Sequence, residues 1–223
     1  MARLHESGYR TLGLVEAADC LRRREPFPER AFVVTFDDGY QSVYDEAFPV
    51  LQQFGVSATV FLTVGEKGDG SAGGRLPSFE GRSMLSWSEM REMQRRGISF
   101  GAHTLTHPDL TRLPSYRIEA EVFGSKRIIE DALGIGVDCF AYPYGRFDSR
   151  SHDIVRQHFS YACTDRLGLI TRKSDHYLLE RVDAYYLRTE ALFDLMLSRL
   201  FPWYIRARSI SRSIRRAVAR NVA

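Results

Sequence analysis

Short apolar runs alternate with helical patterns along most of this 223-residue chain. A run of apolar and β-branched residues predicts a buried strand, and apolar residues that recur every three or four positions predict an amphipathic helix. The predicted strands cover 31–36, 57–64, 98–102, 137–142, 160–164 and 178–184. The predicted helices cover 13–23, 43–54, 87–96, 114–133, 153–158 and 189–200. This alternation is typical of an α/β fold with a parallel sheet or barrel, and residues 1–200 suffice for one domain with a full core.

Polar residues of catalytic types follow three of the predicted strands. Asp37 and Asp38 end the first strand, in the segment TFDDGY. His103 and His107 follow the third strand in HTLTH, and the segment 142–145, YPYG, follows the fourth. In parallel α/β folds the active site gathers at the C-terminal ends of the strands. We therefore expect these three segments to meet at one edge of the sheet or barrel.

One carboxylate and two imidazoles are a suitable ligand set for a catalytic divalent metal that keeps positions open for water and substrate. Such a metal polarises a carbonyl group and lowers the pKa of its bound water towards about 7. The second carboxylate, which is not a ligand, can then accept a proton from that water. The spacing does not settle which of Asp37 and Asp38 takes which role. Together these residue types predict a hydrolase.

The turn after Pro143 offers a further element of such a site. A backbone N–H in this tight turn, with Tyr144 as its natural donor, would help to hold a developing oxyanion. Pro143 fixes the local backbone, and Gly145 permits an unusual dihedral angle beside it.

In this order and at these strand ends, the three motifs resemble those of the polysaccharide deacetylases of the NodB-homology type, carbohydrate esterase family 4. The resemblance covers residues 8–184 and implies a distorted (β/α) barrel that removes acetyl groups from N-acetylated sugars in a metal-dependent reaction. It also implies that Asp37 is the general base and that the backbone of Tyr144 lies in the oxyanion site. The resemblance further implies that Asp38, His103 and His107 are the ligands of the metal, for which zinc is the expected ion.

The third motif departs from the family pattern. In the family it often begins with an arginine that orients the catalytic base, and Ala141 stands at that position here. Arg181 resembles an arginine that replaces it in one branch of the family. An arginine beside Asp37 would hold that carboxylate ionised and oriented. A surface salt bridge is the alternative role for Arg181.

The general acid is a second departure. Family members usually carry a late L-x-x-H segment whose histidine protonates the leaving amine, and no histidine follows His176 here. In a branch similar to this chain, the equivalent histidine lies on a strand before the first helix. We therefore expect this chain to lack that N-terminal strand, with His5 as a weak substitute. The first ten residues hold no apolar signal-peptide segment, so the chain as it stands would be cytoplasmic, or exported if a further segment precedes it.

Residues 201–223 form a basic tail with six arginines and no acids, so the net charge of +3 becomes −3 for the first 200 residues once these six are subtracted. In a helix, one face of the tail would carry Ala207, Ile210, Ile214, Ala217 and Val218, with Arg208, Arg212, Arg215 and Arg216 towards the other. A basic amphipathic helix suits an anionic membrane surface or the groove of a partner; a disordered, solubilising terminus is the alternative. The acidic body and the lack of a recognition motif argue against nucleic acid as a partner.

The motifs leave the substrate open. The expected partner is an N-acetylated or O-acetylated polysaccharide or oligosaccharide, and a related hydrolase of non-sugar amides would carry the same residues. A third possibility is a catalytically weak homologue that binds glycan, which the missing acid histidine favours. The glycine-rich stretch 65–82 lacks the G-K-[ST] ending of a phosphate-binding loop and predicts a surface loop without a nucleotide role. The oligomeric state is not indicated by the sequence.

Overall fold

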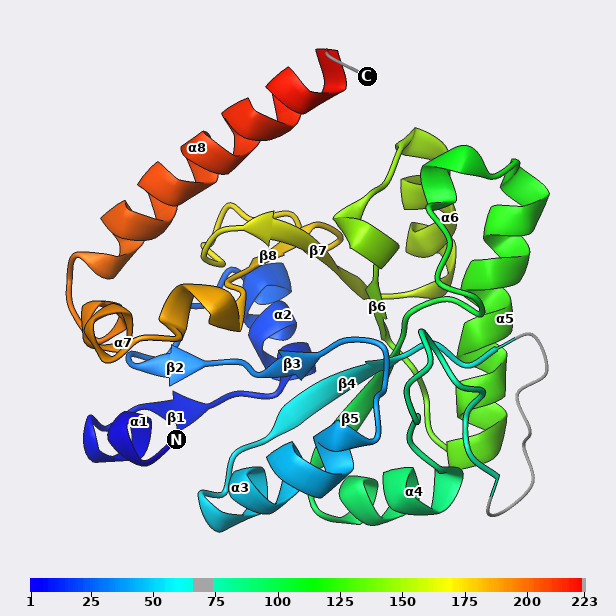
Figure 1. Ribbon diagram of the computed structural model, residues 1–223, viewed down its shortest axis with the longest axis horizontal. Coiled ribbons are helices and arrows are strands. Elements are labelled where there is room, and N and C mark those ends of the chain that lie inside the picture. Colours follow the sequence, from blue (N-terminus) through cyan, green and yellow to red (C-terminus); the bar gives the residue numbers. More distant parts are fainter. Residues whose placement is uncertain (66–73, 222–223) are drawn as a thin grey trace.

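A curled, six-stranded parallel sheet forms the centre of the protein (Figure 1). The computed structural model describes residues 1–65 and 74–221. The strands follow one another in the sheet in chain order: β3 (Thr35–Phe36), β4 (Ala58–Leu62), β5 (Ile98–Ala102), β6 (Cys139–Ala141), β7 (Tyr161–Leu167) and β8 (Leu179–Arg181). Every neighbouring pair is parallel. The predicted fold class, a distorted (β/α) barrel, is confirmed; among the described residues no ladder joins the edge strands β3 and β8, so the barrel is open there.

Helices cover the convex face of the sheet. They are α3 (Phe48–Gln53), α4 (Trp87–Arg95), α5 (Ser115–Leu133) and α6 (Ser149–His158). Side chains on this face of the strands, such as Val60 and Phe140, share one buried core with helical residues such as Met90 and Ile118. The ends of these helices have local causes: Ser86 and Glu89 form a capping box at the start of α4, and Gly134 ends α5 with a φ of 66°.

The concave face is filled by α2 (Leu14–Arg23). Side chains alternate between the two faces of a strand, so the neighbours of the convex core residues point inward. The buried cluster on this inner face joins α2 to the strands and contains Leu14, Ala18, Leu21, Phe61, Cys139, Ala141, Tyr161, Cys163 and Leu179. Asp19 of α2 also accepts a hydrogen bond from the Tyr161 hydroxyl. The helix thus closes the gap that the open barrel leaves between its edge strands (Figure 1).

The predicted buried strand 31–36 is wrong in one respect, because it is two short strands. β2 (Ala31–Phe32) pairs with β1 (Arg10–Thr11) in a separate two-stranded parallel sheet, and β3 begins only at Thr35. The residues of both strands are half-buried rather than buried. Val33 and Val34 continue the apolar run across the break, so the sequence pattern hides it.

The predicted helix 43–54 is also divided. Residues Val43–Ala47 form a wide π-helical turn, and α3 begins at Phe48. Pro49 lies in the first turn of α3 and has no N–H to donate to the preceding turn. The regular α-helical hydrogen bonds therefore begin anew at this point. The other predicted strands and helices are present, with their ends shifted by a few residues.

The chain ends pack around this domain. α1 (Ala2–Glu6) precedes β1, and α7 (Glu190–Met196) leads to α8 (Phe201–Asn221), which projects past the sheet (Figure 1). The predicted basic tail is therefore helical as far as the structure describes it. Among the described residues, none of the helices has both the length and the apolar character that a bilayer crossing requires.

Candidate metal centre

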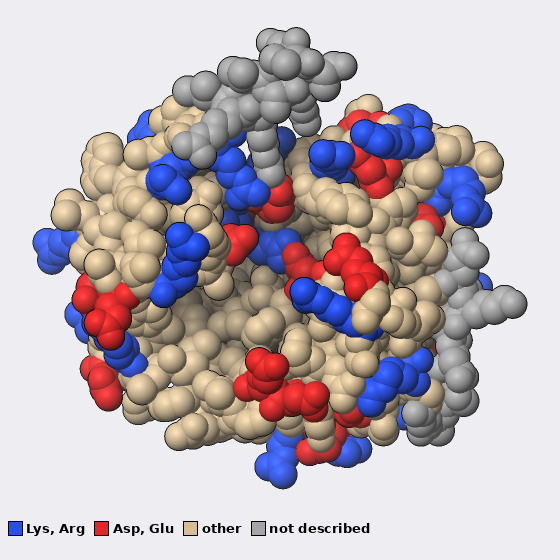
Figure 2. All heavy atoms as spheres, in the orientation of Figure 1, with Lys and Arg blue, Asp and Glu red and all other residues tan. Residues whose placement is uncertain are grey.

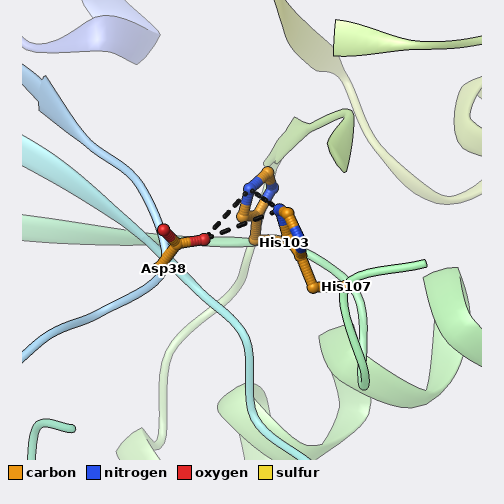
Figure 3. A group of neighbouring side chains, drawn as sticks. All are labelled: Asp38, His103 and His107. Atoms are coloured by element: carbon orange, nitrogen blue, oxygen red, sulfur yellow. Dashed lines mark hydrogen bonds and ion pairs between the residues drawn. The ribbon is translucent and has the colours of Figure 1, made fainter. Parts of the chain in front are cut away.

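Three side chains from distant segments converge at the C-terminal ends of β3 and β5 (Figure 3). Asp38 follows β3, His103 follows β5 directly, and His107 lies one turn of loop further on. The Oδ1 atom of Asp38 lies 3.6 Å from the Nε2 atom of His103 and 3.6 Å from that of His107. The two Nε2 atoms are 3.1 Å apart. The three ligands predicted from the sequence thus lie together.

The spacing of these three atoms fits a tetrahedral metal. Donor atoms at 2.0–2.1 Å from such an ion are separated by about 3.3 Å, and the three separations observed lie on either side of this value. Among the described residues, the buried Asp38 Oδ1 and His107 Nδ1 atoms have no hydrogen-bond partner. A buried carboxylate oxygen is normally bonded. A zinc-like cation at this place would satisfy it.

Local contacts also set the protonation of the imidazoles. The Nδ1 atom of His103 lies 2.7 Å from the carbonyl oxygen of Ala141 in β6. Because a carbonyl only accepts, Nδ1 donates and Nε2 keeps its lone pair for a ligand. Burial lowers the pKa of both His103 and His107, which favours the neutral form that binds metals. Burial raises the pKa of Asp38, and the adjacent Asp37 adds to this effect.

The second carboxylate, Asp37, is bound by an arginine. Two nitrogens of the Arg181 guanidinium donate to the two carboxylate oxygens of Asp37, at 2.7 and 2.8 Å. Arg181 lies at the end of β8, and its Nε atom donates to the carbonyl oxygen of Thr164 in β7. The pair therefore bridges the open side of the barrel, from β8 to β3. Of the two roles considered for Arg181, the structure places it on Asp37.

Arg181 also controls the charge of Asp37. Burial is the largest single influence and by itself would raise the pKa of Asp37, but the Arg181 guanidinium, together with His103 and His107, lowers it, and the net pKa lies below the usual value. We expect Arg181→Gln to raise this pKa, so that the acid limb of the pH profile of kcat/KM moves to higher pH. The wild-type carboxylate is ionised above its lowered pKa, whereas the variant would need a higher pH to reach the same state. An unchanged acid limb in a variant that still folds would contradict this role.

The turn that carries Tyr144 lies against the ligands. The Tyr144 ring is 4.6 Å from the ring of His107, centroid to centroid, and the residue has a φ of 56°. Gly145 also has a positive φ, of 60°, and a Cβ there would overlap the carboxylate of Asp165. Only glycine fits this position, which gives the YPYG motif its last residue. The assignment of the Tyr144 backbone to an oxyanion site stays a prediction.

Glu121 of α5 is a site residue that the sequence analysis missed. Its side chain is 3% exposed. Its carboxylate accepts hydrogen bonds from the backbone N–H groups of Leu105 and Thr106, at 2.8 and 2.9 Å, and from the Thr106 hydroxyl at 2.7 Å. The loop needs such support because Thr104 and His107 both have positive φ, which is strained for residues with a side chain. Glu121 therefore fixes the loop that presents both imidazoles.

We expect Glu121→Gln to lower the affinity for zinc by about ten- to a hundredfold, because the amide of glutamine cannot accept all three bonds and the loop loses its fixed shape. Glu130→Gln is a matched control, since Glu130 lies on the same helix and accepts a bond from the Val137 backbone N–H, remote from the histidine loop. Zinc affinity is measured by competition with a chelator. Equal affinities in the two variants would assign Glu121 to general stability alone.

A hairpin of the predicted surface loop also reaches the site. Residues 66–73 of that loop lie outside the described part of the chain. Phe79 and Arg82 pair across a tight turn, and the Phe79 ring lies 5.2 Å from the ring of His107. Glu80, in the same turn, accepts a hydrogen bond from the Tyr40 hydroxyl at 3.3 Å. This part of the loop therefore covers one side of the ligand group. The glycine-rich sequence of the loop did not predict this contact.

His5, considered as a substitute acid, lies elsewhere. It belongs to α1 and lines a separate cavity with residues such as Tyr9, Phe32 and Phe54. None of the three ligands lines that cavity. The structure therefore does not bring His5 into the metal centre.

Known proteins are similar to this chain in sequence. A family model described as polysaccharide deacetylase matches residues 24–160. YxkH of Bacillus subtilis (strain 168), provisionally named a polysaccharide deacetylase, is 30% identical over 183 residues, which are 82% of this chain and 61% of YxkH. Poly-beta-1,6-N-acetyl-D-glucosamine N-deacetylase of Escherichia coli (strain K12) is 35% identical over 131 residues, 56% of this chain and 18% of that protein. The chain thus spans less than two thirds of either relative.

Solved structures show the same fold. IcaB from Ammonifex degensii superposes with a TM-score of 0.71 at 28% sequence identity, over 87% of this chain and 83% of that one. The family match spans all three motifs, from the carboxylate pair after β3 to the turn after β6. By sequence and by fold, this chain belongs to the polysaccharide deacetylase family.

Proposed function

We propose that this protein is a metal-dependent hydrolase that removes acetyl groups from N-acetylated sugars of a polysaccharide or oligosaccharide. The observation that carries the proposal is the division of the two adjacent carboxylates. Asp38 lies with two histidines as an unsatisfied ligand group, whereas Asp37 is engaged by Arg181 and kept ionised. A ligand group beside a separate base is the arrangement that metal-assisted hydrolysis needs.

In this proposal Asp38, His103 and His107 hold the metal, which is most simply zinc because one carboxylate and two imidazoles leave a tetrahedral site open. When bound, the ion supplies Lewis-acid polarisation of the acetyl carbonyl and an acidified water. Asp37 accepts the proton of the attacking water on its carboxylate. Arg181 orients Asp37, and the backbone N–H of Tyr144 donates to the oxygen on which charge develops.

The relatives support a glycan as substrate. The Escherichia coli relative is named for poly-β-1,6-N-acetyl-D-glucosamine, and a Staphylococcus aureus protein of the same name is 23% identical over 171 residues. We therefore propose N-acetylglucosamine units as the first substrates to test, with O-acetylated sugars as the second class.

Acetate release and metal content, measured on one preparation, test the proposal. The substrates are N-acetylglucosamine oligomers with β-1,6 and β-1,4 links, O-acetylated sugars and small non-sugar amides. Acetate from an acetylated sugar, lost on chelation and restored by zinc, supports it. Acetate from the non-sugar amides alone would favour a related amide hydrolase, and bound metal without acetate from any substrate would favour a glycan-binding homologue.

A further inference from the structure

The helix α8 is fixed to the domain through its arginine-bearing face. Phe201 and Ile205 are 8% and 2% exposed and pack against Leu167 at the end of β7. One helical turn after Ile205, Arg208 lies over the ring of Tyr186. One turn later, Arg212 donates a hydrogen bond to the carboxylate of Asp165 at 3.1 Å. These contacts occupy the side of the helix that an amphipathic helix would normally turn to water.

The opposite face of α8 is apolar and points away from the domain. At 100° per residue, Trp203, Ala207 and Ile210 lie opposite Ile205 and Arg212. Trp203 is 70% exposed and Ile210 is 56% exposed, and Ala207 is exposed as well. The predicted continuation of this face at Ile214, Ala217 and Val218 falls on side chains outside the described part of the chain. An exposed apolar stripe turned outward marks an interaction surface.

The charged residues of α8 itself are all basic. Residues 201–223 hold six arginines and no acid, and Arg206 is exposed beside Trp203 and Ile210. In Figure 2 basic side chains lie at the upper left of the molecule, where the described part of α8 runs in Figure 1. An occupant of this surface must therefore accept tryptophan and isoleucine and also carry negative charge. A second copy of the chain would instead bring two arginine-rich helices together.

We propose that the outward face of α8 binds the surface of an anionic lipid membrane, with the helix lying in the plane of that surface. Trp203, Ala207 and Ile210 would enter the boundary between headgroups and acyl chains, and Arg206, which is exposed beside them, would contact anionic headgroups. Arg212 joins α8 to Asp165, which lies under the Gly145 turn. Membrane binding would therefore fix the orientation of the metal centre relative to the surface.

Vesicle binding tests this inference without any glycan, so its outcome does not depend on the proposed deacetylase activity. The whole chain is mixed with vesicles of phosphatidylcholine alone or with an equal part of phosphatidylglycerol, and bound protein is measured by flotation. We expect at least about tenfold tighter binding to the anionic vesicles, weakened by added salt. Binding should shift the fluorescence of Trp203 to shorter wavelength, whereas Trp87 is fully buried and should not respond.

Ile210→Asp places an acid on the proposed membrane face and should lower anionic vesicle binding about tenfold or more. The side chain is exposed, so the variant should fold and keep its metal affinity. Tyr116→Asp is the matched control, because Tyr116 is an apolar residue of α5 that is 73% exposed and remote in sequence from α8. It should leave vesicle binding unchanged.

Three outcomes would overturn the proposal. The first is equal binding to both kinds of vesicle, or no binding. The second is equal loss of binding in Ile210→Asp and Tyr116→Asp. The third is a dimer, seen by light scattering, that does not bind either kind of vesicle and that Ile210→Asp dissociates. This result would assign the face to a second copy of the chain.

Discussion

Asp37→Asn is expected to lower kcat/KM for an acetylated sugar about a thousandfold while the protein still binds one equivalent of zinc. The amide cannot accept a proton from water, so the base is lost. The ligand group is untouched, because it consists of Asp38, His103 and His107, whereas both Asp37 carboxylate oxygens are bonded to Arg181. Acetate release gives the rate, and chelator competition gives the zinc affinity.

Glu89→Gln is a matched control for the loss of a carboxylate from an arginine pair. Glu89 binds Arg75 through both carboxylate oxygens, at 3.0 and 3.2 Å, as Asp37 binds Arg181. It lies at the start of α4 and is not one of the ligands. This variant should keep its activity. If Asp37→Asn lost zinc and turnover to the same extent, Asp37 would be a ligand and our division of roles between the two carboxylates would be wrong.

His103→Ala is expected to lose zinc and activity together. The alanine variant lacks the buried imidazole whose orientation is set by the carbonyl oxygen of Ala141. Asp38 and His107, whose Oδ1 and Nε2 atoms are 3.6 Å apart, would remain, and two ligand atoms are too few to bind zinc tightly. We expect the zinc affinity to fall at least about a hundredfold. Zinc in hundredfold excess over its dissociation constant stabilises the wild-type fold by about 2.7 kcal/mol, so a rise in Tm with zinc should be absent in the variant.

His158→Ala controls for the loss of a half-buried histidine. His158 pairs with Glu119 at 2.5 Å on the convex side of the sheet and belongs to no ligand group among the described residues. Its Tm should still rise with zinc. Retention of stoichiometric zinc by His103→Ala would remove this histidine from the metal centre.

Much of the fold was predictable because its signals are local. The apolar runs of β4 and β5 and the helical spacing of α2 and α5 are visible within a few residues, and the structure has all four elements. The boundaries inside 31–36 and 43–54 were not predictable in this way. Phe32 and Thr35 belong to different sheets although the apolar run between them is unbroken, and strand pairing depends on a partner elsewhere in the chain.

The supporting residues of the site were hidden for the same reason. Glu121 is one of several acids on an amphipathic helix, and only its burial against the 105–106 backbone distinguishes it. Phe79 lies in a glycine-rich loop, and only its contact with the ring of His107 in the folded protein identifies it as a residue near the site. The direction of α8 was likewise hidden: its periodicity shows two faces, but packing of Ile205 on Leu167 decides which one meets the domain.

The sequence by itself determined which chemical groups stand at the strand ends, since each motif follows its strand within one or two residues and parallel strands end at one edge. Only the tertiary structure decided what each group meets there. Asp37 and Asp38 are neighbours of the same residue type, and their difference comes from Arg181 at the far edge of the sheet and from two histidines after β5. Charge and burial act through space, so residues far apart along the chain set the state of each carboxylate.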